Sequence, residues 1–243
     1  MLVAQERPVG WLVLGITAVI LLGCRRTFAK DVLLLVIAVA VLGVTPITTD
    51  ISVRHILIMG STLSIALLLP YLVSRFLYRD YLVRFRFHHG CAWYRHEMLY
   101  ILFTTGVSYF LLPFFLRSTG SYRYWTVTPD VGAILRLFLG TNALGIWDEL
   151  FFVSTVLGIL RRFFPFLVAN AVQAVLFTSF LYELGFRGWG WIMIGIFALI
   201  QGEVFRRTDS LFYVITIHLC LDLVLFLALI AAYYPAWMPI FVT

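Results

Sequence analysis

The stretch Val214–Leu229, VITIHLCLDLVLFLAL, carries two titratable side chains in an otherwise apolar segment. His218 and Asp222 are four residues apart, so on a helix they lie on one face, one turn from each other. A second pair, Asp148 and Glu149, interrupts another apolar segment. A buried carboxylate beside a histidine can act as a general base on water, and the same groups can instead bond one another and fix helix packing. The residue types alone leave both interpretations open.

The elements that position these side chains must be membrane helices. Of the 243 residues, 62% are hydrophobic, whereas soluble domains are about half apolar. The mean hydropathy is +0.98. An ionisable residue inside a membrane span costs about 2.5–3.5 kcal/mol on insertion and usually faces the bundle interior or a cavity. The composition therefore predicts an all-α polytopic membrane bundle that forms one domain over residues 1–243.

A helix needs about 20 mainly apolar residues to cross a bilayer. We expect eight transmembrane helices, at 10–23, 32–49, 55–74, 98–116, 131–160, 164–182, 188–204 and 211–234. The fifth is too long for one straight crossing, so it should be tilted or broken. Arg136 lies within this span, about three turns from Asp148, and a direct pair between them is not expected.

The cationic residues indicate the orientation. With eight spans, twelve of the 18 Lys and Arg residues fall in loops on one side and five on the other. Cationic loops stay in the cytoplasm, so both termini should lie outside, and we expect a bacterial cytoplasmic membrane. The net charge of +6 is then explained by loop arginines and does not indicate nucleic-acid binding.

The sequence allows a comparison of how deep Glu149 and His218 lie along their two helices. Glu149 lies twelve residues before Arg161, and His218 lies eleven residues after Arg207. At 1.5 Å per residue, both sit about 16–18 Å from the basic ends of their helices. The two side chains can therefore meet at one level. The sequence predicts a buried polar cluster of Asp148, Glu149, His218 and Asp222.

The loop Arg84–Glu97 interleaves arginines with aromatic residues, as segments that lie on a lipid surface do. It holds His88, His89 and His96, which makes a metal site conceivable, but a lipid-touching loop, in the form of a surface helix, fits the pattern better. The three cysteines have no metal-like spacing. No cofactor and no metal are expected.

Three stretches carry a family resemblance. They are WDELFFVSTVLGILRRF (Trp147–Phe163), FTSFL (Phe177–Leu181) and RRTDSLFYVITIHLCLD (Arg206–Asp222). In order and spacing, they resemble the motifs Glu-Glu-x-x-x-Arg, Phe-x-x-x-His and His-x-x-x-Asn of the CPBP family, the CAAX prenyl-protease and bacteriocin-processing (Abi-type) membrane proteins. The resemblance covers residues 130–225, whereas 1–125 hold no recognised motif.

The resemblance implies a site in which paired glutamates and two histidines activate water for peptide cleavage, and an Asn stabilises the oxyanion. Asp148 and Glu149 hold the glutamate positions, and His218 holds the last histidine. The departures are Asp148 for Glu, Val153 for Arg, Leu181 for His, and Asp222 for Asn. An aspartate at the Asn position replaces a donor with an anion that repels a developing oxyanion unless it is protonated.

Two functions of different classes follow. The first is a CPBP-like protein with weakened or lost catalysis that acts as an accessory or scaffold subunit of a membrane complex. The second is an active intramembrane endopeptidase that cleaves a membrane-associated, prenylated or bacteriocin-like peptide. A small transporter or lipid-handling protein ranks last, because neither paired inverted halves nor matched broken helices are visible. The expected partners are the lipid bilayer and, in the first case, other membrane subunits.

Overall fold

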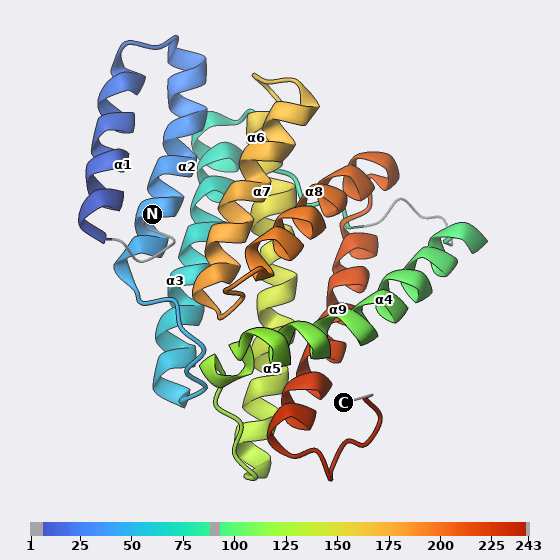
Figure 1. The fold of residues 1–243 in the computed structure, drawn as a ribbon. Coiled ribbons are helices and arrows are strands. Elements are labelled where there is room, and N and C mark those ends of the chain that lie inside the picture. The colour runs from blue at the N-terminus through green and yellow to red at the C-terminus, as the bar shows by residue number, and fades with distance from the viewer. Residues whose placement is uncertain (1–6, 88–92, 242–243) are drawn as a thin grey trace.

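The computed structural model describes residues 7–87 and 93–241, and within them the chain is all helical (Figure 1). The helices and helical turns are α1 (Arg7–Leu22), α2 (Arg26–Val44), α3 (Val53–Leu72), η1 (Val73–Tyr78), α4 (Arg95–Thr119), η2 (Ser121–Tyr124), α5 (Val131–Asp148), η3 (Glu149–Val156), α6 (Leu157–Leu160), α7 (Phe166–Glu183), α8 (Gly190–Thr208) and α9 (Leu211–Tyr233). α5, η3 and α6 follow one another without a gap, as α3 and η1 do, so the described chain contains eight helical rods. The predicted all-α membrane bundle is confirmed.

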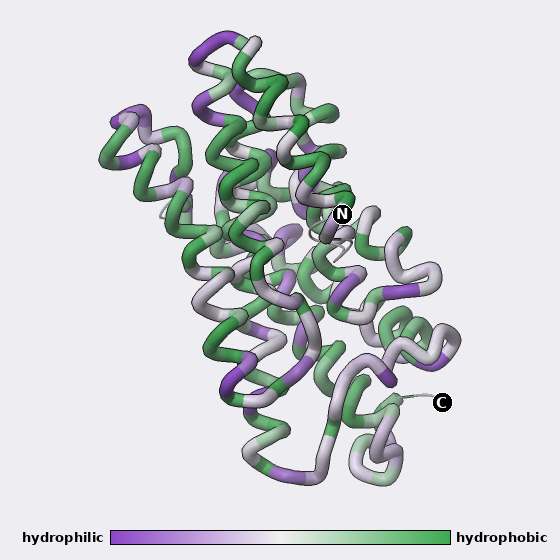
Figure 2. The backbone as a smooth tube through the Cα atoms, turned by 90° about the vertical axis from the view of Figure 1, so that its left-hand side faces the viewer, coloured by the Kyte–Doolittle hydropathy of each residue, from purple (hydrophilic) through white to green (hydrophobic). Residues whose placement is uncertain are grey.

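Six of these rods are long and apolar enough to cross a membrane: α2, α3 with η1, α4, α5 through α6, α7 and α9. α1 is apolar but shorter, and α8 ends in a charged turn with Arg206 and Arg207. Hydrophilic residues concentrate at loops and helix ends, while the rods are mainly hydrophobic (Figure 2). Helices satisfy every backbone polar group internally, as a hydrocarbon environment requires.

Local sequence signals set where the rods begin. The side chains of Ser52, Asp130 and Ser210 accept hydrogen bonds from backbone N–H groups in the first turns of α3, α5 and α9. Such caps satisfy N–H groups that have no partner within the helix. α4 ends where Gly120 adopts a left-handed backbone, with φ of 69°.

The fifth rod changes helix type instead of breaking. From Glu149 to Val156 the backbone widens to π-helical geometry, and the helix then continues to Leu160. The Thr155 hydroxyl donates to the Leu150 carbonyl, five residues back, at 2.9 Å. π-helical segments inside α-helices frequently occur at functional sites. Here the widened segment begins at one of the predicted site residues.

An aromatic core surrounds the widened segment. Trp147 stacks on Phe151 with ring centroids 4.7 Å apart, and Phe152 lies edge-on to Phe177 at 5.0 Å. The Trp147 indole N–H also donates to the Leu63 carbonyl of α3 at 2.8 Å. The central rod is therefore held on the side of α7 and on the side of α3. Buried ring pairs of this kind each contribute about 0.5–1.5 kcal/mol beyond the area they bury.

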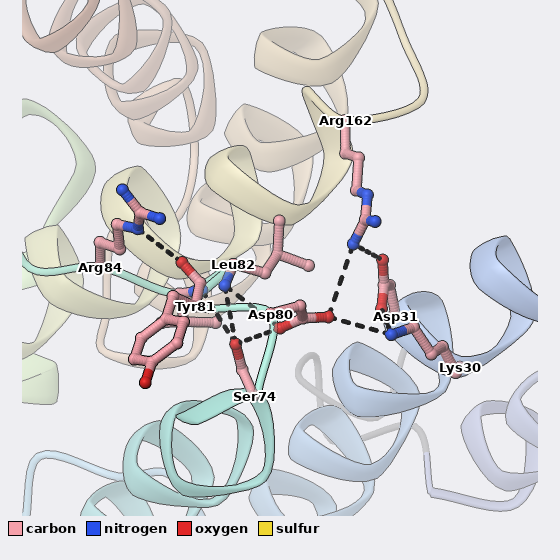
Figure 3. A network of polar contacts seen from close by, with 9 residues as sticks. Lys30, Asp31, Ser74, Asp80, Tyr81, Leu82, Arg84 and Arg162 are labelled. Atoms are coloured by element: carbon pink, nitrogen blue, oxygen red, sulfur yellow. Dashed lines mark hydrogen bonds and ion pairs between the residues drawn. The ribbon is translucent and has the colours of Figure 1, made fainter. Parts of the chain in front are cut away.

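Residues 79–87 form an extended segment, here called the strap, that is fastened at both ends. At its start, Asp80 accepts hydrogen bonds from Ser74 and Lys30 (Figure 3). The Arg162 guanidinium bonds the buried Asp31 at 2.8 Å and lies 3.5 Å from Asp80. This network ties the strap to the ends of α2 and α6.

The other end of the strap reaches α9. The carbonyls of Arg86 and Phe87 accept hydrogen bonds from the first backbone N–H groups of α9, and Arg86 pairs with Asp209. The Arg84 carbonyl accepts from the Ser154 hydroxyl at 3.0 Å. The expected surface helix is thus wrong for residues 84–87, because they are non-helical and their backbone carbonyls bond α9 and Ser154. Contact of this loop with lipid stays a prediction. Residues 88–92, with His88 and His89, lie outside the described residues.

Candidate functional site

The predicted contact between the fifth and last rods is present. His218 Nδ1 lies 2.7 Å from Glu149 Oε1, and both side chains are buried. Glu149 opens the π-helical segment, and His218 lies about two turns into α9. The comparison of helix positions therefore located the contact correctly, while the assignment of a catalytic set stays a prediction.

A third side chain completes this contact. The amide of Gln201, from α8, donates to Glu149 Oε1 at 2.9 Å and to the Val214 carbonyl at 3.1 Å. Glu149 thus accepts from two helices at once. The sequence reasoning missed Gln201. The available signal is a single polar amide within the apolar stretch GWGWIMIGIFALIQGEV.

Asp222 lies on the other side of the imidazole. Its Oδ1 is 3.8 Å from His218 Nε2, which is an ion-pair distance rather than a hydrogen bond. Asp222 also lies against the backbone of α5 at Gly145, where an added Cβ would come within 2.0 Å of Asp222 Oδ2. Only glycine leaves room for the carboxylate at this position. The His218 ring is held by Phe197, edge-on at 5.2 Å, and by Phe177 at 6.0 Å.

A cavity of about 360 Å³ lies beside the cluster, between α4 and α8. We call it the lateral groove. Its walls are mainly apolar, with Phe103 and Val107 from α4 and Ile196 from α8, and all three are exposed on the outside of the bundle. Three residues of the polar cluster, Asp148, His218 and Asp222, also line this groove, together with Gln201. The groove therefore joins the polar cluster to the lateral face of the bundle.

Glu149 is set apart from this groove. It is 0% exposed and is not among the residues that line the groove. On the strap side, Phe85 packs with Leu150 against the buried residues Val214 and Leu211. Leu150 follows Glu149, and Val214 precedes His218 by one turn, so these apolar contacts adjoin the polar cluster along both helices. The Glu149 carboxylate is therefore enclosed by protein groups of the described residues.

The charges of the cluster do not balance. Three carboxylates surround one imidazole, which can neutralise at most one of them. Asp148 Oδ1, Glu149 Oε2 and Asp222 Oδ2 have no hydrogen-bond partner among the described protein groups. Uncompensated buried charge is very costly, so protons or water must satisfy these atoms. Asp148 and Asp222 face a cavity that is large enough for water.

At two of the positions where this chain departs from the family motifs, a buried apolar side chain stands in place of a polar one. Val153, at the arginine position of the first motif, is fully buried. Leu181, at the missing histidine, is buried and lines the groove. Glu183 is engaged in an ion pair with Arg187. Among the described residues, no group of three His, Cys, Asp or Glu side chains is arranged to hold a metal ion.

Comparison with known proteins supports the resemblance of this region. Residues 130–224 match the family model described as type II CAAX prenyl endopeptidase Rce1-like. This segment is Rce1-like. The match confirms the CPBP-type resemblance and covers α5 through most of α9, which supply all four predicted site residues. No curated protein and no solved structure matches the chain.

The Rce1-like segment and the N-terminal helices meet at the site. α4 forms one wall of the lateral groove, and Phe85 of the strap packs against apolar residues in the first turns of α9, although neither α4 nor the strap lies in the matched residues. The chain is an integral membrane protein with an Rce1-like core. Its N-terminal part contributes directly to the surroundings of that core.

Proposed function

We propose that this chain binds a membrane-embedded peptide or lipidated segment in the lateral groove, with weak or no hydrolysis, as a subunit or scaffold of a membrane complex. One observation carries the proposal. The groove is open on the lateral face, but Glu149, at the general-base position, is buried outside it. A general base must come within hydrogen-bond reach of the water it activates.

The remaining groups of the cluster are poorly matched to the family chemistry. Leu181 supplies no proton carrier, and Asp222 supplies an acceptor where the family motif has an amide donor. Both side chains line the groove and would lie beside a bound peptide. The apolar walls offer a hydrocarbon chain or an apolar helix a surface that matches lipid. Cleavage would need the histidine and the asparagine that Leu181 and Asp222 replace, whereas binding in the groove does not need them.

The test is binding of a farnesylated peptide by the full chain in lipid nanodiscs. The probe follows from the prenyl substrate named in the family description. Val107→Trp places a large ring at the groove wall and should weaken binding at least tenfold. Leu102→Trp on the same helix is the matched control, because Leu102 is 68% exposed and does not line the groove. Equal affinities for the two variants, or no binding by the wild type, would overturn the proposal.

A second function, hydrolysis, is favoured by a separate observation. Asp148, His218 and Asp222 line the groove, and the two aspartates have unpartnered oxygens that can hold water. A protonated Asp222 would donate a hydrogen bond as the family asparagine does. Turnover of the same peptide that disappears with His218→Gln would establish this second function in place of the first.

A further inference from the structure

A second cavity lies between α3 and α5, on an adjacent face of α5. Its volume is about 200 Å³, and we call it the α3–α5 groove. Gly60 and Gly140 line it, and a Cβ added at either would meet no atom within 4 Å. The two glycines therefore face open space and leave the groove hollow. Ile56, Met59 and Leu144 give it apolar walls.

The groove has a charged rim where α3 and α5 begin. Arg136 lies there, and its Nε donates to the Ile51 carbonyl at 3.0 Å. Arg136 Nη2 is 4.0 Å from Asp130 Oδ2, which is a long ion-pair contact. A guanidinium has five N–H donors, so this arginine retains donors for a ligand. It is the intramembrane cation that neither the cluster nor the lateral groove uses.

The rim also carries an anion. Asp50 lines the same groove and accepts hydrogen bonds from the backbone N–H of Ser52 at 2.8 Å and from its hydroxyl at 3.0 Å. These bonds, the backbone one first, hold the pKa of Asp50 below its ordinary value. Its carboxylate is therefore charged at neutral pH. A ligand head group at this rim meets a cation and an anion at the start of an apolar groove.

We propose that the α3–α5 groove binds a phospholipid with a zwitterionic head group of the phosphatidylethanolamine class. The phosphate is held by Arg136, since guanidinium groups match phosphate oxygens bidentately. The ammonium group is held by Asp50, and one acyl chain follows the apolar walls. Trp147 lines the groove eleven residues beyond Arg136, which gives about 16 Å along the helix for the chain.

The charges at the rim select this head group over the alternatives. A purely anionic head group has one cation to bind and meets Asp50, with Asp130 nearby. A purely cationic amphiphile meets Arg136. A head group that carries both a negative and a positive charge can pair with Arg136 and with Asp50. The two grooves adjoin and share lining residues, among them Thr141 and Leu144. The inference is nevertheless independent of the proposed function, because Asp50, Arg136 and Gly140 line the α3–α5 groove alone.

The experiment measures thermal unfolding of the delipidated full chain in detergent, with added phosphatidylethanolamine or phosphatidylglycerol. We expect phosphatidylethanolamine to raise the melting temperature by several degrees more than phosphatidylglycerol, because a ligand that binds the native state stabilises it. Asp50→Asn should remove this preference. Gly140→Leu, which fills the groove, should remove the stabilisation by phosphatidylethanolamine.

Gly106→Leu is the matched control. Gly106 is also a helix glycine with open space around it, but it lies on α4 and lines neither groove. This variant should keep the full response. Equal responses to the two lipids, a larger response to phosphatidylglycerol, or an unchanged response in Gly140→Leu would each overturn the proposal. Native mass spectrometry of the same samples distinguishes one retained lipid from a diffuse annulus.

Discussion

Glu149 and His218 lie 69 positions apart in the chain and meet at 2.7 Å in the middle of the bundle. The contact joins the π-helical segment of the fifth rod to α9. Gln201 adds a third helix to it through its amide. The polar cluster therefore fixes three helices of the bundle relative to one another, in addition to any chemistry it supports.

Removing both partners of this contact should cost less than the sum of the costs of removing each one alone. His218→Leu leaves Glu149 buried without its partner, which typically costs about 3–5 kcal/mol for a buried pair. The double variant with Glu149→Leu should lose less than the sum of the single variants. Chemical unfolding in detergent provides the free energies for the cycle. Strict additivity would show that the two side chains do not interact.

Gln201→Leu should destabilise the fold and change the site at the same time. The loss of two buried hydrogen bonds costs about 1–3 kcal/mol in unfolding free energy. Gln173→Leu is the control, because the Gln173 amide makes two comparable bonds, to Asn170 and the Ala198 carbonyl, away from the cluster. Both variants should melt earlier, but only Gln201→Leu should alter peptide binding in the lateral groove. Similar binding in both would contradict a site role for Gln201.

Gly145→Ala tests the close approach of Asp222 to α5. The added methyl group collides with the carboxylate, and overpacking of this kind costs about 1–3 kcal/mol. In an Asp222→Ala background most of this cost should disappear, because the carboxylate is gone and the nearest remaining atom, His218 Cδ2 at 3.1 Å from the added methyl group, requires only a small shift. Gly158→Ala should stabilise in both backgrounds, since it has open space. An effect of Gly145→Ala that is independent of residue 222 would disprove the packing.

The strap network predicts a pH dependence of stability. Burial raises the pKa of Asp80, but hydrogen bonds from Ser74, Lys30 and the Leu82 backbone outweigh it and hold the pKa below its ordinary value. The stabilisation is thus present above the unfolded value, about pH 3.9, and is lost as the pH falls through the lower folded value. Asp80→Asn should melt earlier than the wild type at pH 6, and the difference should shrink toward pH 3. A constant difference would contradict the assignment.

The sequence predicts the helices and the central contact for a physical reason. Apolar runs separated by basic loops define the rods, and the constant helical rise converts the spacing to Arg161 and Arg207 into matching depths for Glu149 and His218. The strap could not be predicted in this way. Its position depends on backbone carbonyls of Arg84, Arg86 and Phe87, which any residue supplies, so the aromatic and basic pattern there pointed to lipid.

Gln201 shows a second limit. A single amide in an apolar helix carries no periodic signal, and its partners come from other rods. The burial of Glu149 outside the lateral groove was equally invisible in the sequence, because it depends on how side chains from different rods pack around it. The motif positions identified which residues meet, but not which of them face the groove.

The most direct test of the account measures binding and cleavage together. The full chain in nanodiscs is incubated with the farnesylated peptide, and bound and cleaved peptide are quantified for the wild type and Glu149→Gln. The account predicts that both bind the peptide with affinities within about threefold, and that any cleavage above that in protein-free nanodiscs is equally slow in both. Cleavage by the wild type that is abolished in Glu149→Gln would contradict it and show that Glu149 reaches the substrate.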